Sequence, residues 1–176
     1  PALAADGRCK TFDASANGYA RSEGLATVVL KRLADAEADG ERILSLIRGS
    51  ALNHDWQTSG LTVPNGESQE RLIGQALANA EVAPEEIGYL ETHGTGTPLG
   101  DPIEVRALGR VFGHSHSAAK PLLIGSAKTN VGHAEAAAGL VGLIKVILAL
   151  QHQQLPPHLH LRQPNPYIPW AQLPIE

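Results

Sequence analysis

Several residue types that mark particular classes of protein are scarce or absent in this chain. Its 176 residues include one cysteine, no methionine and only 4% aromatic residues. A single cysteine excludes an internal disulfide and makes a cytoplasmic location the expectation. Few aromatic rings and a formal net charge of −4 leave no basic, base-stacking surface for nucleic acid. We therefore expect no nucleic acid among its partners.

Long uncharged apolar runs are also missing. The longest candidate, AEAAAGLVGLIKVILALQ, carries Lys145 in its middle, and no run approaches the ~20 residues of a membrane span. No signal peptide opens the chain, so we expect no membrane association. The absence of methionine and the start at Pro1 indicate a processed or excised piece. With 43% apolar and 18% charged residues, the composition is that of a globular protein.

The hydrophobic pattern alternates between strand-like and helix-like segments after an irregular lead-in at residues 1–24. β-branched, apolar runs predict strands at residues 25–33, 42–54, 87–91 and 121–128, with a loop at 34–41. Apolar residues at helical spacing predict helices at 67–80, from 101 to about 112, and at 134–153. The alternation favours an α/β fold with its core in residues 25–155 and an extended, proline-rich tail at 156–176.

Two of the predicted helices have further sequence features. Asp101 is a good N-cap residue, Pro102 suits the first helical position, and Glu104 stands at capping-box spacing from Asp101. The helix at 134–153 is apolar on nearly every face, which predicts that it is buried in the core.

Two segments, YLETHGTGT and LLIGSAKTNVGH, share one design. Each runs from an apolar strand into a glycine-containing turn with a histidine, His93 or His133, and then into a helix. A single histidine at a strand end is more often a hydrogen-bonded structural residue than a catalyst. Two such turns, the second with Lys128 and Glu135 nearby, favour a functional site, because strand ends of α/β sheets commonly bind ligands.

Other kinds of site fit the sequence less well. GSAKT lacks the earlier glycine of a phosphate-binding loop. The pairs His114/His116 and His158/His160 have no cysteine or carboxylate cluster to complete a metal site, so we predict none. Cys9 is flanked by Arg8 and Lys10, which would lower a thiol pKa, but it lacks a small-residue turn into a helix. We interpret Cys9 as an ordinary loop residue.

ETHGTGTPLGDPIEV together with LIGSAKTNVGHAEAAAGLVGLIKVILALQ resembles the two histidine motifs of β-ketoacyl synthases, above all the ketosynthase domains of modular type I polyketide synthases. DGRCKTFDASANGYARSEG and LPPHLHLRQPNPYIPW fit the same family, so the likeness covers essentially the whole chain. The resemblance implies a thiolase-like fold, in which a layered mixed sheet carries helices on both faces. It also implies a Cys-His-His active site that performs a decarboxylative Claisen condensation.

The resemblance assigns roles to individual residues of this chain. His93 and His133 would donate hydrogen bonds to the malonyl thioester oxygen as enolate charge develops. Lys128 would form a supporting ion pair with Glu135. Thr95 and Thr97 would hold the phosphopantetheine arm of an acyl carrier protein, because their alternation places both hydroxyls on one side of an extended loop. No cofactor is expected to bind directly, since the phosphopantetheine is the carrier's.

One departure from the family is large, because the turn that carries the nucleophilic cysteine is missing. The family places that turn upstream of the segment that opens this chain, so we expect a C-terminal portion of a ketosynthase whose N-terminal half is absent. The portion alone should be inactive, and the intact enzyme should be a homodimer. NHDWQTSGL, with Trp56, is unusual for its position, and its role stays open.

Two other functions remain open from the sequence. One is a non-catalytic, ketosynthase-like domain that serves carrier-protein docking or structure. The other is a thiolase-like condensing enzyme of fatty-acid type, which differs in substrate and not in chemistry.

Overall fold

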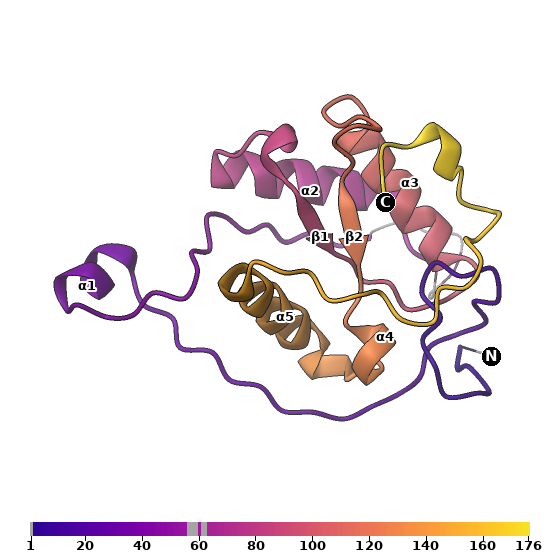
Figure 1. The fold of residues 1–176 in the computed structure, drawn as a ribbon, viewed down its shortest axis with the longest axis horizontal. Helices are drawn as coiled ribbons and strands as arrows, with labels where there is room; N and C mark the ends of the chain where they lie inside the picture. The colour runs from indigo at the N-terminus through magenta and orange to yellow at the C-terminus, as the bar shows by residue number, and fades with distance from the viewer. Residues whose placement is uncertain (1, 56–59, 61–62) are drawn as a thin grey trace.

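The computed structural model describes residues 2–55, 60 and 63–176 (Figure 1). The Trp56 loop therefore lies partly outside the described residues. A packed body contains the two strands, most helices and both chain ends, while residues 23–55 form an arch that runs out from the body and returns (Figure 1). Helices and a parallel sheet together make the chain α/β, as the sequence predicts.

The described sheet has two parallel strands, β1 (Tyr89–Glu91) and β2 (Leu123–Gly125), with Tyr89 paired to Leu123 and Glu91 to Gly125. Parallel neighbours need a crossover connection, and α3 (Gly100–Phe112) provides it. The pairing continues past β1, where the Thr92 N–H donates to the Gly125 oxygen at 2.8 Å. The carboxyl ends of both strands are therefore adjacent, and each leads into one of the two histidine motifs.

The hydrophobic core lies along one face of α3. Val105, Leu108 and Phe112 recur at the helical spacing of three and four and are at most 2% exposed. They pack with Phe12 from the lead-in, Leu122 from before β2, and Ile168 and Ile175 from the tail. Burial of each such side chain contributes roughly 1.5–3 kcal/mol, so α3 is the anchor that fixes the loops beside it.

The remaining helices surround this core. α2 (Gly66–Ala80) packs against α3, and α5 (Ala138–His152) packs against β1. Short turns complete the body: η1 (Pro84–Glu86), α4 (Lys128–Val131), η2 (Glu135–Ala137) and η3 (Trp170–Gln172). The helices predicted at 67–80 and 134–153 are confirmed, and the glycine-containing turn predicted to carry His133 is largely the helical turn α4.

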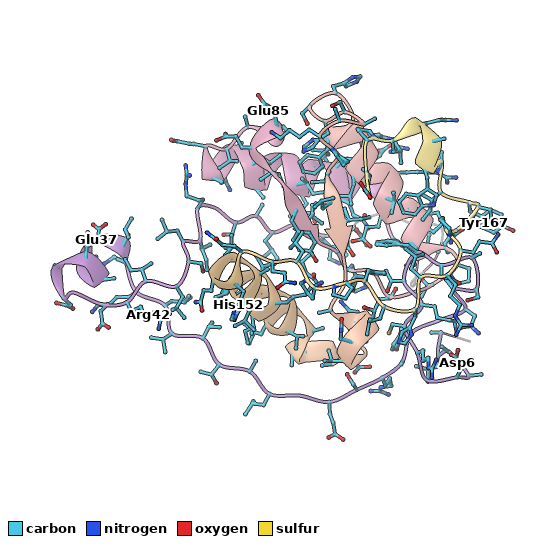
Figure 2. All side chains as sticks on the ribbon, in the orientation of Figure 1. Asp6, Glu37, Arg42, Glu85, His152 and Tyr167 are labelled. Atoms are coloured by element: carbon cyan, nitrogen blue, oxygen red, sulfur yellow. The ribbon has the colours of Figure 1, made fainter. Side chains whose placement is uncertain are left out.

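The two strands predicted at 25–33 and 42–54 are wrong for this structure. Neither segment joins a ladder, and α1 (Leu33–Ala38) replaces the predicted loop. Side chains suited to a buried strand stand in solvent: Leu25 is 96% and Val29 94% exposed. Figure 2 shows the side chains of Glu37 and Arg42 projecting from this arch, away from the body. A strand needs a neighbouring strand for its backbone groups, and among the described residues the arch contacts α2 instead, as where Asn79 Nδ2 donates to the Ser50 oxygen.

The expectation that α5 is a buried core helix is also wrong. None of its residues is buried, because β1 covers one side and the opposite side faces solvent. By length and composition alone, residues Glu135–His152 could cross a membrane, with a mean hydropathy of 1.4. Lys145, in the middle of this window, forms an ion pair with Glu91 on β1, which ties the helix to the sheet.

Candidate active site

A cavity of about 460 Å³ opens where β1 and β2 end. His93 follows β1, Lys128 begins α4 after β2, and His133 follows α4, and all three line this cavity. The two imidazole rings lie edge to face, with centroids 5.5 Å apart. The fold thus brings together two histidines that are far apart in sequence. Glu91, Glu135 and Gly142 also contribute to the cavity wall.

His133 is held by its backbone on both sides. Its N–H donates to the Ala20 oxygen at 2.7 Å, and its own oxygen accepts the Ser22 N–H at 3.0 Å. The ring is fixed by the Glu135 N–H, which donates to Nδ1 at 3.0 Å. Because Nδ1 accepts, the neutral ring carries its proton on Nε2. Burial and the charge of Lys128 lower the pKa of His133, which keeps the ring neutral at pH 7.

His93 is also kept neutral. Loss of hydration against the cavity wall, followed by the charges of Lys128 and His133, lowers the pKa of His93 to about 4. The residue keeps an exposed edge toward the cavity, so a ligand can reach it. A neutral imidazole with one N–H is a hydrogen-bond donor that carries no charge of its own.

Two acidic residues of α3 hold the backbone of the loop that carries His93. Glu104 accepts the N–H groups of His93 and Gly94 at 2.7 and 2.9 Å. Asp101 accepts the N–H groups of Gly96, Thr97 and Phe12 at 3.1, 3.3 and 2.8 Å. Burial raises the pKa of Asp101 to about 6, against the lowering effect of these three donors.

The predicted cap of α3 is wrong in detail. The helix begins at Gly100, so the N-cap residue is Leu99 and not Asp101, and the Gly100 N–H donates to the Thr97 hydroxyl at 3.1 Å. Asp101 and Glu104 face the preceding loop instead, because that loop leaves several N–H groups without a backbone partner. Sequence reasoning missed this holding role. The signal was present as Asp101 in the first helical turn and Glu104 just after it, directly behind a Gly-Thr loop.

Thr95 and Thr97 lie on the same side of their loop. Their hydroxyl oxygens are 3.4 Å apart, and Thr95 is only 7% exposed. Gly96 between them has a φ of +78°, and a Cβ there would lie 2.9 Å from the Lys10 nitrogen, so only glycine fits. Neither threonine is among the described residues that line the histidine cavity.

The predicted ion pair between Lys128 and Glu135 is wrong. Glu135 pairs with Arg21, at 2.9 Å between Oε1 and Nε, and the described residues contain no ion pair between Lys128 and Glu135. Glu135 stands on the exposed rim, next to the segment where Arg21 bridges to His133, whereas Lys128 is only 8% exposed. Burial lowers the pKa of Lys128, and the carboxylates of Glu104 and Glu91 oppose that shift.

Cys9 is buried, at 1% exposed, and its sulfur accepts the Ala20 N–H at 3.2 Å. Burial raises the pKa of this thiol and outweighs the expected lowering effect of Lys10, so the Cys9 pKa is raised and not lowered. In residues 2–55, 60 and 63–176, no group of three or more His, Cys, Asp or Glu side chains is placed to hold a metal ion.

Comparison with protein families places this geometry in context. The model of the β-ketoacyl synthase C-terminal domain matches residues 44–162, and that of the N-terminal domain matches residues 1–36. The chain belongs to the β-ketoacyl synthase family. Ketosynthase structures show the same fold. The oxazolomycin ketosynthase domain OzmH KS7 of Streptomyces albus is 46% identical with a TM-score of 0.93, and the match covers 99% of this chain and 31% of that one.

Other ketosynthase relatives agree. The ketosynthase from module 6 of the bacillaene synthase of Bacillus subtilis is 44% identical with a TM-score of 0.94, over 99% of this chain and 31% of that one. A phenolphthiocerol/phthiocerol polyketide synthase of Mycobacterium tuberculosis is 53% identical over 98% of this chain, which spans 9% of that protein. The PKS-NRPS hybrid synthetase acdB of Aspergillus candidus is 58% identical over 96% of this chain and 7% of its own length.

Proposed function

We propose that this chain supplies the two active-site histidines of a polyketide-type β-ketoacyl synthase, an acyltransferase. The observation that carries the proposal is the meeting of His93 and His133 in one cavity, with ring centroids 5.5 Å apart. Both rings are held neutral beside the buried ammonium of Lys128. The similarity to polyketide synthases of a bacterium and a fungus supports the polyketide assignment over the fatty-acid type.

The proposed reaction begins with a malonyl-type thioester whose carbonyl oxygen lies between the two imidazoles. The bond to the carboxylate breaks, CO2 leaves, and the electron pair forms an enolate whose negative charge gathers on the thioester oxygen. N–H donors fixed in advance stabilise this charge, at roughly 10²–10³-fold in rate for each donor. The enolate carbon then attacks an acyl thioester, a carbon–carbon bond forms, and the cysteine thiolate leaves.

The acyl-bearing cysteine must come from elsewhere, because Cys9 is buried and its pKa is raised. We assign it to a complementary N-terminal half of the ketosynthase. The bare strand-like segments of the arch and the uncovered side of α5 support such a partner, because both present apolar side chains to solvent. We extend the proposal to a homodimeric, cytoplasmic enzyme.

The extender would arrive on the phosphopantetheine arm of an acyl carrier protein. Thr95 and Thr97 are assigned to this arm, because their paired hydroxyls face one side of the loop that carries His93. The arm belongs to the carrier, so this chain needs no resident cofactor for the reaction.

The proposal is tested in the full-length ketosynthase that contains this chain. His93→Ala and His133→Ala should each lower condensation and decarboxylation by about 10²-fold or more, since each removes one donor to the enolate oxygen. Loading of the nucleophilic cysteine, followed by intact mass, should persist. His114→Ala, in an exposed loop, is the matched control. Condensation unchanged in either active-site variant would refute the assignment and favour a non-catalytic docking domain.

A further inference from the structure

A carboxylate beside the two histidines binds three donors from three segments. Oε2 of Glu91 accepts the Tyr89 hydroxyl at 2.6 Å and the Lys145 ammonium at 2.7 Å. Oε1 accepts the N–H of Ala127 at 2.5 Å. The side chains of Glu91 and Lys145 are only 12% and 16% exposed, so this is an enclosed ion pair and not a surface one.

Glu91 and its partners Ala127 and Lys145 lie close in sequence to the proposed catalytic residues or on the wall of their cavity. Glu91 is the last residue of β1 and lies two positions before His93. Ala127 directly precedes Lys128, at the start of α4. Lys145 belongs to α5, the helix that follows His133 and forms the far wall of the cavity. One carboxylate therefore links the segments that bear His93 and Lys128 to α5, the helix that begins at Ala138 after His133.

The surrounding backbone leaves just enough room for this arrangement. A Cβ placed at Gly142, one turn before Lys145, would lie 3.0 Å from Cγ of Glu91. A Cβ at Gly125 would lie 2.8 Å from the Tyr89 hydroxyl and 3.4 Å from the Lys145 ammonium. The glycines on both sides allow α5 and β2 to approach the carboxylate closely. Tyr89 completes the set, since its oxygen also accepts from Lys145 at 2.8 Å.

We propose that the Glu91–Lys145 pair is a positioning device that sets the distance and orientation of His93, Lys128 and His133. The inference rests on the proposed function and deepens it, because neither residue is assigned a part in the reaction. An enclosed pair is weak as a source of stability, since desolvation offsets its attraction. Its three fixed bonds instead determine how β1, α4 and α5 meet, and rates of enzyme reactions depend steeply on such placement.

The test uses the full-length ketosynthase that contains this chain and measures CO2 release from a malonyl thioester carried on acyl carrier protein. Glu91→Gln and Lys145→Gln should lower kcat by about 10- to 100-fold, because displaced histidines no longer match the enolate oxygen. KM should change by no more than about 2-fold, since the carrier is bound elsewhere. Lys145→Arg keeps both charge and donors and should retain most of the wild-type kcat.

Glu70→Gln is the matched control, because it removes the Glu70–Arg110 ion pair that joins α2 to α3 outside the cavity. Equal kcat values for Glu91→Gln and Glu70→Gln would overturn the inference. If Glu91→Gln does not fold, Lys145→Gln and Lys145→Arg decide the matter, and equal kcat values for these two would overturn it as well. A wild-type enzyme that neither decarboxylates nor condenses would instead count against the proposed function.

Discussion

The body and the arch of this chain contain segments with similar sequence patterns but reach opposite outcomes. Short apolar runs at β1 and β2 pair with each other and carry the site at their ends. Longer and more β-branched runs at 25–33 and 42–54 join no strand ladder among the described residues and leave Leu25 at 96% exposed. The residues of the arch therefore have the stronger intrinsic preference for β-strand, yet the observed strands β1 and β2 lie in the body.

The difference shows that a strand is defined by its neighbours as much as by its residues. β2 receives β1 on one side, and the tail reaches it on the other, where the Ile124 N–H donates to the Glu176 oxygen. The described residues of the arch join no strand ladder, and its returning limb meets α2 through side-chain-to-backbone contacts, as where Asn79 Nδ2 donates to the Ser50 oxygen at 2.8 Å. β-propensity describes how well a side chain fits a pleated, half-buried surface, and it cannot supply that surface.

The largest expected effect comes from one substitution made in both regions. Leu108→Ala in α3 should lower the free energy of unfolding by about 2–5 kcal/mol, because it opens a cavity at a side chain that is 2% exposed. Leu25→Ala in the arch should change it by no more than about 0.5 kcal/mol. Urea unfolding of both variants measures the contrast. Equal losses would show that the arch packs as tightly as the body.

Sequence reasoning performed best where periodicity and packing agree. The helices at 67–80 and 134–153 and the strands before His93 and Lys128 were all predicted, since their patterns are satisfied by contacts within the chain. The cap of α3 and the Lys128–Glu135 pair were predicted wrongly. The two errors share one cause, because neither the spacing behind the cap prediction nor the family resemblance behind the ion pair reveals a donor from another segment. Arg21 and the Gly94–Thr97 loop are those donors.

A second contrast concerns pH, through Asp101 in the body. Its pKa rises from 3.8 to about 6 on folding, so the folded state binds the proton more tightly. The tighter proton binding at Asp101 adds ~3 kcal/mol to the free energy of unfolding below pH 3.8. This contribution is lost as the pH rises to about 6. Asp101→Asn should remove this part of the pH dependence. Asp35→Asn, in α1 of the arch, is the matched control. Thermal unfolding from pH 3.5 to 7 compares wild type, Asp101→Asn and Asp35→Asn.

Plots of thermal stability against pH for wild type and Asp101→Asn should therefore diverge between pH 4 and 6 and run parallel above pH 6. A wild-type stability that rises through that interval relative to Asp101→Asn would contradict the assignment. In that case the three N–H donors from Phe12, Gly96 and Thr97 would outweigh burial.

The smallest effect compares a glycine of positive φ in the body with one in the arch, and it separates contacts of a new methyl group from backbone strain. Gly132 before His133 has a φ of +76°, and Gly40 in the arch has a φ of +67°. The ψ of Gly132 is −171°, a backbone region that is essentially restricted to glycine, so alanine there costs of order 1–3 kcal/mol in backbone strain. Only at Gly132 does the new Cβ also meet neighbours, 3.0 Å from the Ala20 oxygen. Gly132→Ala should thus be the more destabilising in urea unfolding, and it alone should shift the His133 imidazole resonances. Equal destabilisation, with His133 unmoved in both variants, would mean that the segment at Ala20 yields to the new methyl group.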